Sequence, residues 1–185
     1  MNALRTMMRS LLLLVILFAT ATSWAVEVGE IPHDYLGKTK DGEEVLLSNS
    51  EGVVRIVTFW ATWCSPCMKE LPVLSAIQKA GAGRIQTIGV NMKEPKRQYL
   101  KAVKAFKDWG LVFTHDRRGT IARKFGVDGI PHMLIIDVDG SVVHKHVGYN
   151  EDALEGIVDE INALLVKNEL FLEAPADQEP EGSRK

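Results

Sequence analysis

The sequence has only two cysteines, and it shows no strong excess of charge of either sign. Two cysteines cannot build a disulfide-rich scaffold, and they cannot supply a four-cysteine zinc site. A formal net charge of −2 argues against a dedicated nucleic-acid-binding protein, which normally carries a marked basic excess. The 185 residues are 46% hydrophobic and 25% charged, which excludes collagen-like and disordered chains and fits one globular domain.

The first 25 residues have the features of a secretory signal peptide. Arg5 and Arg9 precede nine unbroken apolar residues at 11–19, and a cleavage site follows after Ala25. The apolar run is shorter than the roughly 20 residues of a membrane-spanning helix. A retained N-terminal anchor is the alternative. The sequence therefore predicts a periplasmic or otherwise extracytoplasmic protein, in an oxidising compartment where thiols tend to pair.

Strands and helices alternate in the remainder of the chain, which predicts an α/β sheet built on βαβ units. Asp41-Gly42 is a turn signal for an N-terminal hairpin, and residues 53–60 form a β-branched and aromatic run typical of a buried strand. Further strands are predicted at 85–90, 112–113, 133–136 and 142–147, and helices from the cysteines to Gly81 (with Pro72 inside), at 98–109, at 120–125 and at 154–165 after the N-cap Asn150.

The two cysteines lie three positions apart, where the buried strand passes into a helix. If the helix begins near Cys64, its sulfur lies beside free backbone N–H groups and the positive end of the helix dipole, which favour the thiolate. Pro66 suits the first helical turn because it has no N–H group to leave unpaired. Cys67 is expected to be more enclosed and able to attack a mixed disulfide formed at Cys64. The side chain of Trp63 is expected to keep water off the pair.

Two other interpretations of the cysteine pair remain open. A static disulfide would close a very small loop and would remove little entropy from the unfolded chain. A copper or zinc site would need a further ligand, and no histidine lies close in the sequence. We therefore predict a redox-active pair without cofactor or metal, and a copper-binding or metal-delivery module is the non-enzymatic alternative. The Pro-x-x-x-Thr-x-x-Cys pattern of peroxidases is missing.

Three separated motifs together resemble the thioredoxin superfamily. The first is Trp63-Cys64-x-x-Cys67 after a buried strand, with Pro72 five residues further on. The second, Gly129-Ile130-Pro131 before an apolar strand, is similar to the cis-proline loop of the superfamily, and Gly148 is similar to the glycine that borders its substrate groove. The resemblance covers about residues 30–167. It implies an α/β thioredoxin-like fold, with a central mixed sheet flanked by helices, an N-terminal hairpin and a central insertion.

Within the superfamily, the chain is most similar to the exported TlpA/ResA/DsbE branch. The similarity lies in the stretch 59–64, the N-terminal hairpin and the additional segment at 91–116. This similarity implies that the protein is an enzyme, namely a thiol–disulfide reductase that acts on protein substrates. It also implies a membrane-embedded electron donor and, as in several members of the branch, a role in cytochrome c maturation. An oxidant or isomerase of secreted proteins is the alternative direction. We expect a monomer that does not bind nucleic acid, with a domain at 26–170 and a disordered tail at 171–185.

The resemblance also implies roles for individual residues. Glu70, one helical turn after the second cysteine, falls where this branch carries a buried acidic residue that moves protons. The alternative is that Glu70 is a solvated helix residue. Thr58 stands where ordinary thioredoxins have a buried Asp, which leaves Glu70 as the expected proton carrier. His132 follows the cis-proline where the family usually has Thr. It either raises the thiolate population of the pair or hydrogen-bonds in the loop, and we expect the hydrogen bond. His144 and His146 share one strand face by alternation, which we expect to be a solvated edge. The implied catalytic residues are Cys64, Cys67 and Glu70, and the implied groove residues are Trp63, Ile130, Pro131 and Gly148.

Overall fold

A computed structural model of the protein describes residues 25–50 and 52–173. Residues 1–24 of the predicted signal peptide and 174–185 of the predicted tail lie outside the described residues. Within the described ranges, no helix combines the length and apolar character needed to cross a membrane. The elements are β1 (Tyr35–Lys38), β2 (Glu44–Leu46), the 3₁₀ turn η1 (Leu47–Ser50), β3 (Val54–Trp60), α2 (Ser65–Ala80), β4 (Ile85–Met92), α3 (Lys96–Ala105), β5 (Val112–Asp116), α4 (Thr120–Lys124), β6 (His132–Ile136), β7 (Val142–Val147), the 3₁₀ turn η2 (Glu151–Ala153) and α5 (Leu154–Glu173).

The centre of the fold is a five-stranded mixed sheet with the strand order β5-β4-β3-β6-β7. Strands β3, β4 and β5 run parallel, whereas β6 pairs antiparallel with both β3 and β7. All seven residues of β3 are buried, as its nearly continuous β-branched and aromatic run predicted, and Arg55 and Thr58 are buried with the apolar residues. Because the carboxyl ends of the three parallel strands meet at one edge of the sheet, the loops that lead to α2, α3 and α4 also lie there.

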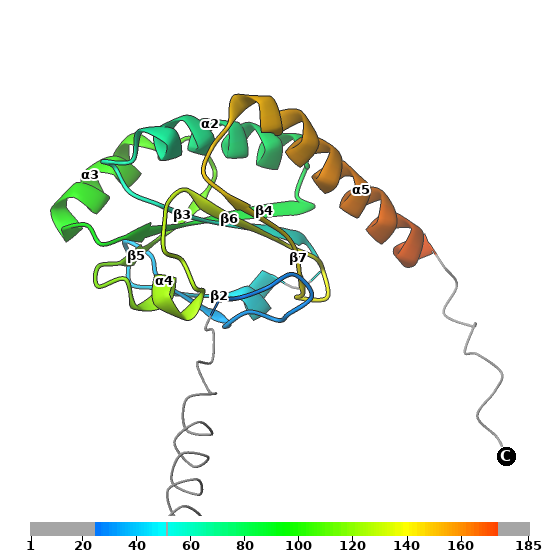
Figure 1. Ribbon diagram of the computed structural model, residues 1–185, viewed down its shortest axis with the longest axis horizontal. Coiled ribbons are helices and arrows are strands. Elements are labelled where there is room, and N and C mark those ends of the chain that lie inside the picture. The colour runs from blue at the N-terminus through cyan, green and yellow to red at the C-terminus, as the bar shows by residue number, and fades with distance from the viewer. Residues whose placement is uncertain (1–24, 51, 174–185) are drawn as a thin grey trace, which may run out of the picture.

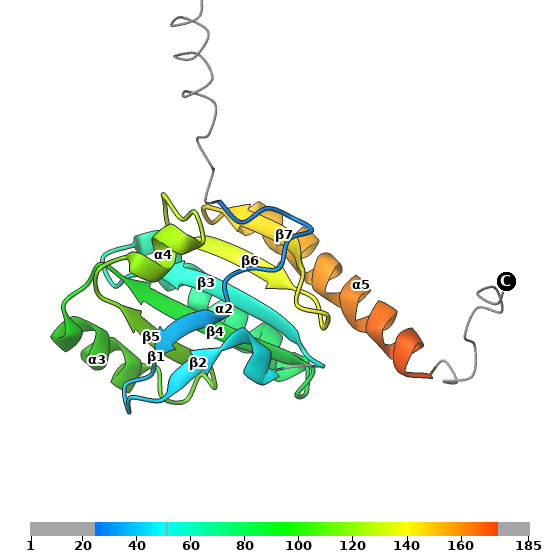
Figure 2. The ribbon, with the colours of Figure 1, turned by 90° about the horizontal axis from the view of Figure 1, so that it is seen from below.

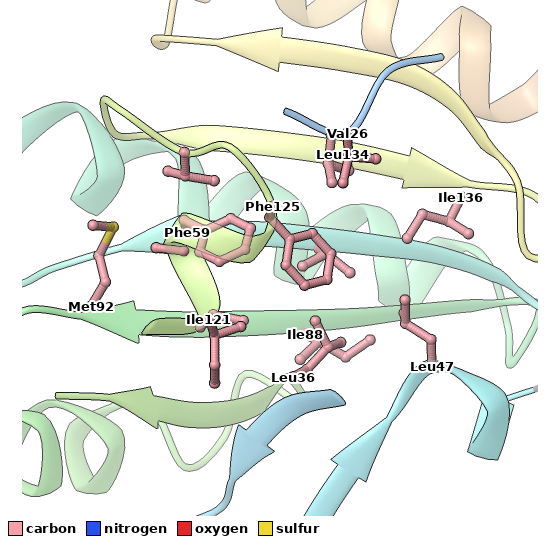
Figure 3. Packing of buried hydrophobic residues seen from close by; sticks show 14 of the residues in the cluster. Val26, Leu36, Leu47, Phe59, Ile88, Met92, Ile121, Phe125, Leu134 and Ile136 are labelled. Atoms are coloured by element: carbon pink, nitrogen blue, oxygen red, sulfur yellow. The ribbon is translucent and has the colours of Figure 1, made fainter. Parts of the chain in front are cut away.

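Helices and a small hairpin cover the two faces of this sheet. Figures 1 and 2 show α2, α3 and α5 on one face, and α4 with the β1–β2 hairpin on the other. On the first face, Leu74 of α2 and Ile157 of α5 belong to one buried cluster. On the second face, the rings of Phe59 and Phe125 lie 5.4 Å apart, in a cluster that also takes Leu36 from the hairpin (Figure 3). The predicted mixed sheet flanked by helices is confirmed.

Several boundaries differ from the prediction. Helix α3 ends at Ala105 instead of 109, because Phe106 and Trp109 stack at 4.0 Å and fold the chain into a turn against the core. Asn150 caps the 3₁₀ turn η2, not α5 directly. The helix α5 continues to Glu173, so the first three residues of the predicted tail are helical. The predicted insertion at 91–116 forms the end of β4, then α3 and the edge strand β5.

Candidate active site

Cys64 and Cys67 are joined by a disulfide at the N-terminus of α2. Cys64 is the N-cap residue, and its Sγ accepts the backbone N–H of Cys67 at 3.2 Å. Pro66 lies in the first turn, as the sequence predicted. When the pair is reduced, this N–H group and the positive end of the helix dipole stabilise a thiolate on Cys64.

The two cysteines differ in their surroundings. Cys67 is fully buried and Cys64 is 5% exposed, and both belong to one apolar cluster with Trp60 and Leu71. Trp63 is 64% exposed. The indole therefore has a large surface in contact with solvent, and the expectation that it keeps water off the pair stays a prediction. The ring also offers an apolar contact surface next to the first cysteine.

The loop before β6 contacts the disulfide. The peptide bond between Ile130 and Pro131 is cis, and the carbonyl oxygen of Ile130 lies 3.7 Å from Cys64 Sγ. Gly148 follows β7 with φ of 83° and donates its N–H to the carbonyl oxygen of Pro131 at 2.8 Å. Val147, directly before this glycine, is an exposed apolar side chain. The structure thus brings Gly148 against the cis-proline loop, and Ile130 of that loop contacts Cys64 Sγ.

Glu70 lies on α2 but is not a solvated helix residue, since it is only 4% exposed. Thr58 of β3 donates its hydroxyl to Glu70 Oε2 at 2.7 Å. Burial raises the pKa of Glu70 to about 7, and the hydrogen bond from Thr58 opposes this rise. Glu70 also lines a hollow of about 240 Å³, together with Met133 and Gly148. A carboxyl group with a pKa near 7 can both accept and release a proton at neutral pH.

The three histidines singled out in the sequence have other surroundings than expected. His132 is 6% exposed and packs edge-on against Phe59, and its Nε2 has no hydrogen-bond partner among the described residues. Burial lowers the pKa of His132. His144 Nδ1 and His146 Nε2 lie 3.4 Å and 2.8 Å from the two carboxylate oxygens of Glu160. These two side chains therefore connect β7 to α5 and do not form a solvated edge.

The sequence analysis missed Glu94, which lies between β4 and α3 and is 2% exposed. Its carboxylate accepts the backbone N–H of Thr62 at 3.2 Å, the hydroxyl of Thr62, and Nδ2 of Asn91 at 2.7 Å. Because Thr62 lies two residues before Cys64, Glu94 fixes the loop that leads to the reactive sulfur. The only sequence signal is an acidic residue shortly after a buried strand, which does not distinguish this role from a solvated turn.

Within residues 25–50 and 52–173, no group of three or more His, Cys, Asp and Glu side chains is placed to hold a metal ion. What the site does contain is a helix-terminal disulfide, a cis-proline loop in contact with it, and a buried carboxyl one turn along the helix. These features define a dithiol–disulfide site on a thioredoxin-like fold.

Comparisons with known proteins agree with this class. The model of the Redoxin family matches residues 27–165, and the chain belongs to that family. It is 32% identical over 126 residues to the thioredoxin-like protein YneN of Bacillus subtilis, covering 66% of this chain and 73% of that protein. It is 31% identical over 153 residues to the thiol-disulfide oxidoreductase ResA of Geobacillus thermodenitrificans, covering 75% and 84%. It is 35% identical over 95 residues to the DsbE homolog of Paracoccus denitrificans, about half of each chain.

Solved structures show the same relationship. A thiol:disulfide interchange protein of Chlorobium tepidum matches with a TM-score of 0.60 and 26% identity, covering 76% of this chain and 99% of that one. StoA of Bacillus subtilis matches with a TM-score of 0.56 and 25% identity, covering 70% and 96%. The protein is therefore a thiol–disulfide oxidoreductase of the ResA/DsbE type, and its cysteine pair is Cys64 and Cys67.

Proposed function

We propose that this protein is an extracytoplasmic reductant of protein disulfides, in which Cys64 is the nucleophile and Cys67 resolves the mixed disulfide. The observation that carries the proposal is the position of Cys64, at a helix N-terminus and in contact with the cis-proline loop. The names of its relatives, thiol-disulfide oxidoreductase and thiol:disulfide interchange protein, support exchange chemistry. The similarity to the TlpA/ResA/DsbE branch supports the reducing direction and a role in cytochrome c maturation, and the features of residues 1–25 support export.

The proposed reaction transfers two electrons from the dithiol to a substrate disulfide. The Cys64 thiolate attacks one substrate sulfur, and the other substrate sulfur leaves as a thiolate that takes up a proton. The Cys67 thiol then gives its proton to the Glu70 carboxylate and attacks Cys64 Sγ. This step releases the second substrate thiolate, which is protonated in turn, and forms the disulfide seen in the structure. Glu70, with its pKa raised to about 7, passes its proton to solvent through the adjacent hollow.

The substrate segment binds in an extended conformation beside the cis-proline loop. Backbone hydrogen bonds next to Ile130 hold the segment, and the exposed side chains of Trp63 and Val147 contact its apolar groups. Pro131 and Gly148, which a backbone hydrogen bond joins, line this groove. A membrane-embedded donor then reduces the disulfide again, supplying two electrons and two protons to a protein that acts as a monomer.

Reduction of insulin disulfides tests the proposed nucleophile. Replacement Cys64→Ser is expected to abolish the reaction, whereas Cys67→Ser is expected to accumulate mixed disulfides with substrate proteins, because the resolving thiol is gone. These stalled adducts identify the substrates by mass spectrometry. Unchanged insulin reduction by Cys64→Ser contradicts the mechanism.

Equilibration with glutathione tests the proposed direction. Superfamily reduction potentials run from about −270 mV for a strong reductant to about −120 mV for a strong oxidant. We expect a value near the reducing end. A value near the oxidising end contradicts the reductant and favours an oxidant or isomerase of secreted proteins. Stoichiometric copper binding with little disulfide exchange contradicts both and favours a metal-delivery module.

A further inference from the structure

Positive charge is concentrated in one part of the chain although the protein as a whole is slightly acidic. Residues 93–124 contain ten of the 22 Lys and Arg residues and only three acidic residues. Two of the three acids, Glu94 and Asp116, are buried and accept hydrogen bonds from neighbouring loops and from the start of α4. All ten basic side chains are exposed. They are Lys93, Lys96, Arg97, Lys101, Lys104, Lys107, Arg117, Arg118, Arg123 and Lys124.

None of these ten side chains forms an ion pair with a carboxylate in the described part of the chain, whereas six other Lys and Arg residues do. Arg123 and Lys124 contact only a backbone carbonyl and the imidazole of His33. Asp108 is the single exposed acid in this region. The positive field of this surface is therefore not neutralised by the protein itself.

Five of the ten lie at the sheet edge that carries the disulfide. Lys93 follows β4, Lys96 and Arg97 begin α3, and Arg117 and Arg118 follow β5. We call these five residues the basic rim. Since β3, β4 and β5 are parallel, the rim lies at the same edge as the loop before α2.

Hydrogen bonds hold the rim against the redox loop. Glu94, next to Lys93, accepts the N–H and hydroxyl of Thr62, two residues before the first cysteine. The N–H of Lys93 donates to the carbonyl oxygen of Asp116 at 3.0 Å, which joins the two basic loops to each other. The position of the rim relative to Cys64 is therefore fixed by buried contacts, not by flexible surface side chains.

We propose that the basic rim docks an acidic redox partner, namely a protein whose reactive disulfide or dithiol is flanked by Asp and Glu side chains. The inference rests on the proposed function, because a docking surface beside Cys64 serves exchange only if the partner brings a disulfide or dithiol to that sulfur. The rim orients the approaching partner, since charge complementarity governs the rate and the orientation of encounter more than the final affinity.

A protein partner fits these observations better than an anionic membrane. The rim lies at the sheet edge that carries the disulfide, and a polypeptide must reach Cys64 for exchange to occur. A membrane bound at the rim would cover the same edge and block the groove. Binding to lipid is therefore the competing outcome of the test.

Three synthetic peptides with one intramolecular disulfide supply the probe. They differ only in the residues that flank the cysteines, which are Glu, Ser or Lys. The reduced protein is mixed with each peptide, and the second-order rate constant of peptide reduction is measured from 20 mM to 1 M NaCl. At low salt we expect the Glu peptide to react about tenfold faster than the Ser peptide. The difference is expected to disappear at 1 M salt, where the Debye length falls to about 3 Å.

Two charge-reversed variants locate the effect. Lys96→Glu/Arg97→Glu and Arg117→Glu/Arg118→Glu are each expected to lose the preference for the Glu peptide and to keep the rate with the Ser peptide. The control Lys101→Glu/Lys104→Glu makes the same change in net charge further along α3 and is expected to keep most of the preference.

Each outcome decides the inference. Equal rates with the Glu and Ser peptides overturn it, and so does an equal loss in the control, which would show a general effect of net charge. Sedimentation with phosphatidylglycerol vesicles that depends on the rim, without any peptide preference, assigns the surface to a membrane and overturns the partner assignment. Absence of exchange with all three peptides contradicts the proposed function itself, a result distinct from exchange without charge preference.

Discussion

The buried carboxyl of Glu70 makes the stability of the fold depend on pH. In the unfolded chain its pKa is the ordinary 4.5, and burial raises it to about 7 in the folded protein. Below pH 4.5 the group is neutral in both states, and folding costs nothing at this site. Between 4.5 and about 7 the unfolded chain releases the proton while the folded protein keeps it. The free energy of unfolding therefore falls as the pH rises through this interval.

The size of this effect follows from the two pKa values. Each pH unit between them lowers the free energy of unfolding by about 1.4 kcal/mol, so the full loss is about 3 kcal/mol. The replacement Glu70→Gln removes the titrating group and still offers an amide oxygen to the hydroxyl of Thr58. Relative to the wild type, this variant is expected to gain about 2 to 3 kcal/mol between pH 5 and pH 8.

Urea unfolding of the oxidised protein at pH 5, 6, 7 and 8 measures this gain. The disulfide must stay intact so that both proteins unfold from the same redox state. Glu155→Gln is the matched control, because it makes the same chemical change at an exposed position of α5. Its stability is expected to follow the wild type at every pH. Parallel curves for Glu70→Gln and the wild type refute the reasoning, since they would show that Glu70 ionises as easily inside the fold as in water.

Other contacts of the site give further expected outcomes. Thr58→Val removes the hydrogen bond that lowers the pKa of Glu70, so the loss of stability is expected to begin at the same pH and to continue to a higher pH in the same unfolding series. Glu94→Ala strands buried donors and is expected to lower the free energy of unfolding by about 2 to 4 kcal/mol, with a smaller loss for Glu94→Gln. Gly89→Ala places a Cβ atom 2.8 Å from the ring of Phe113 and is expected to cost about 1 to 3 kcal/mol in urea unfolding.

The parts of the fold that could be predicted are those with local signals. The strand β3 was predicted from its β-branched and aromatic residues, although Arg55 and Thr58 interrupt the apolar run. The start of α2 was predicted from Pro66, two positions after the first cysteine. Gly81 ends α2 as expected. The cis bond before Pro131 was predicted only from the family resemblance, because no local pattern in the chain specifies it.

The parts that could not be predicted depend on partners far away in the sequence. Glu94 binds Thr62 across 32 residues, and His146 binds Glu160 only because β7 and α5 pack together. The exposure of Trp63 was equally inaccessible to sequence reasoning, since it depends on which segments pack beside the start of α2. Sequence spacing shows which side chains share an element but not which elements meet.

The reactive sulfur stands directly after β3, the middle strand of the sheet, with two strands on either side. Amide hydrogens exchange with solvent first where a sheet frays, at its outermost members, and last at its interior. Transient opening at β5 or β7 therefore leaves the inner strand and the start of α2 in place. The disulfide is therefore anchored next to the innermost strand, so fraying of the edge strands β5 and β7 leaves the start of α2 in place.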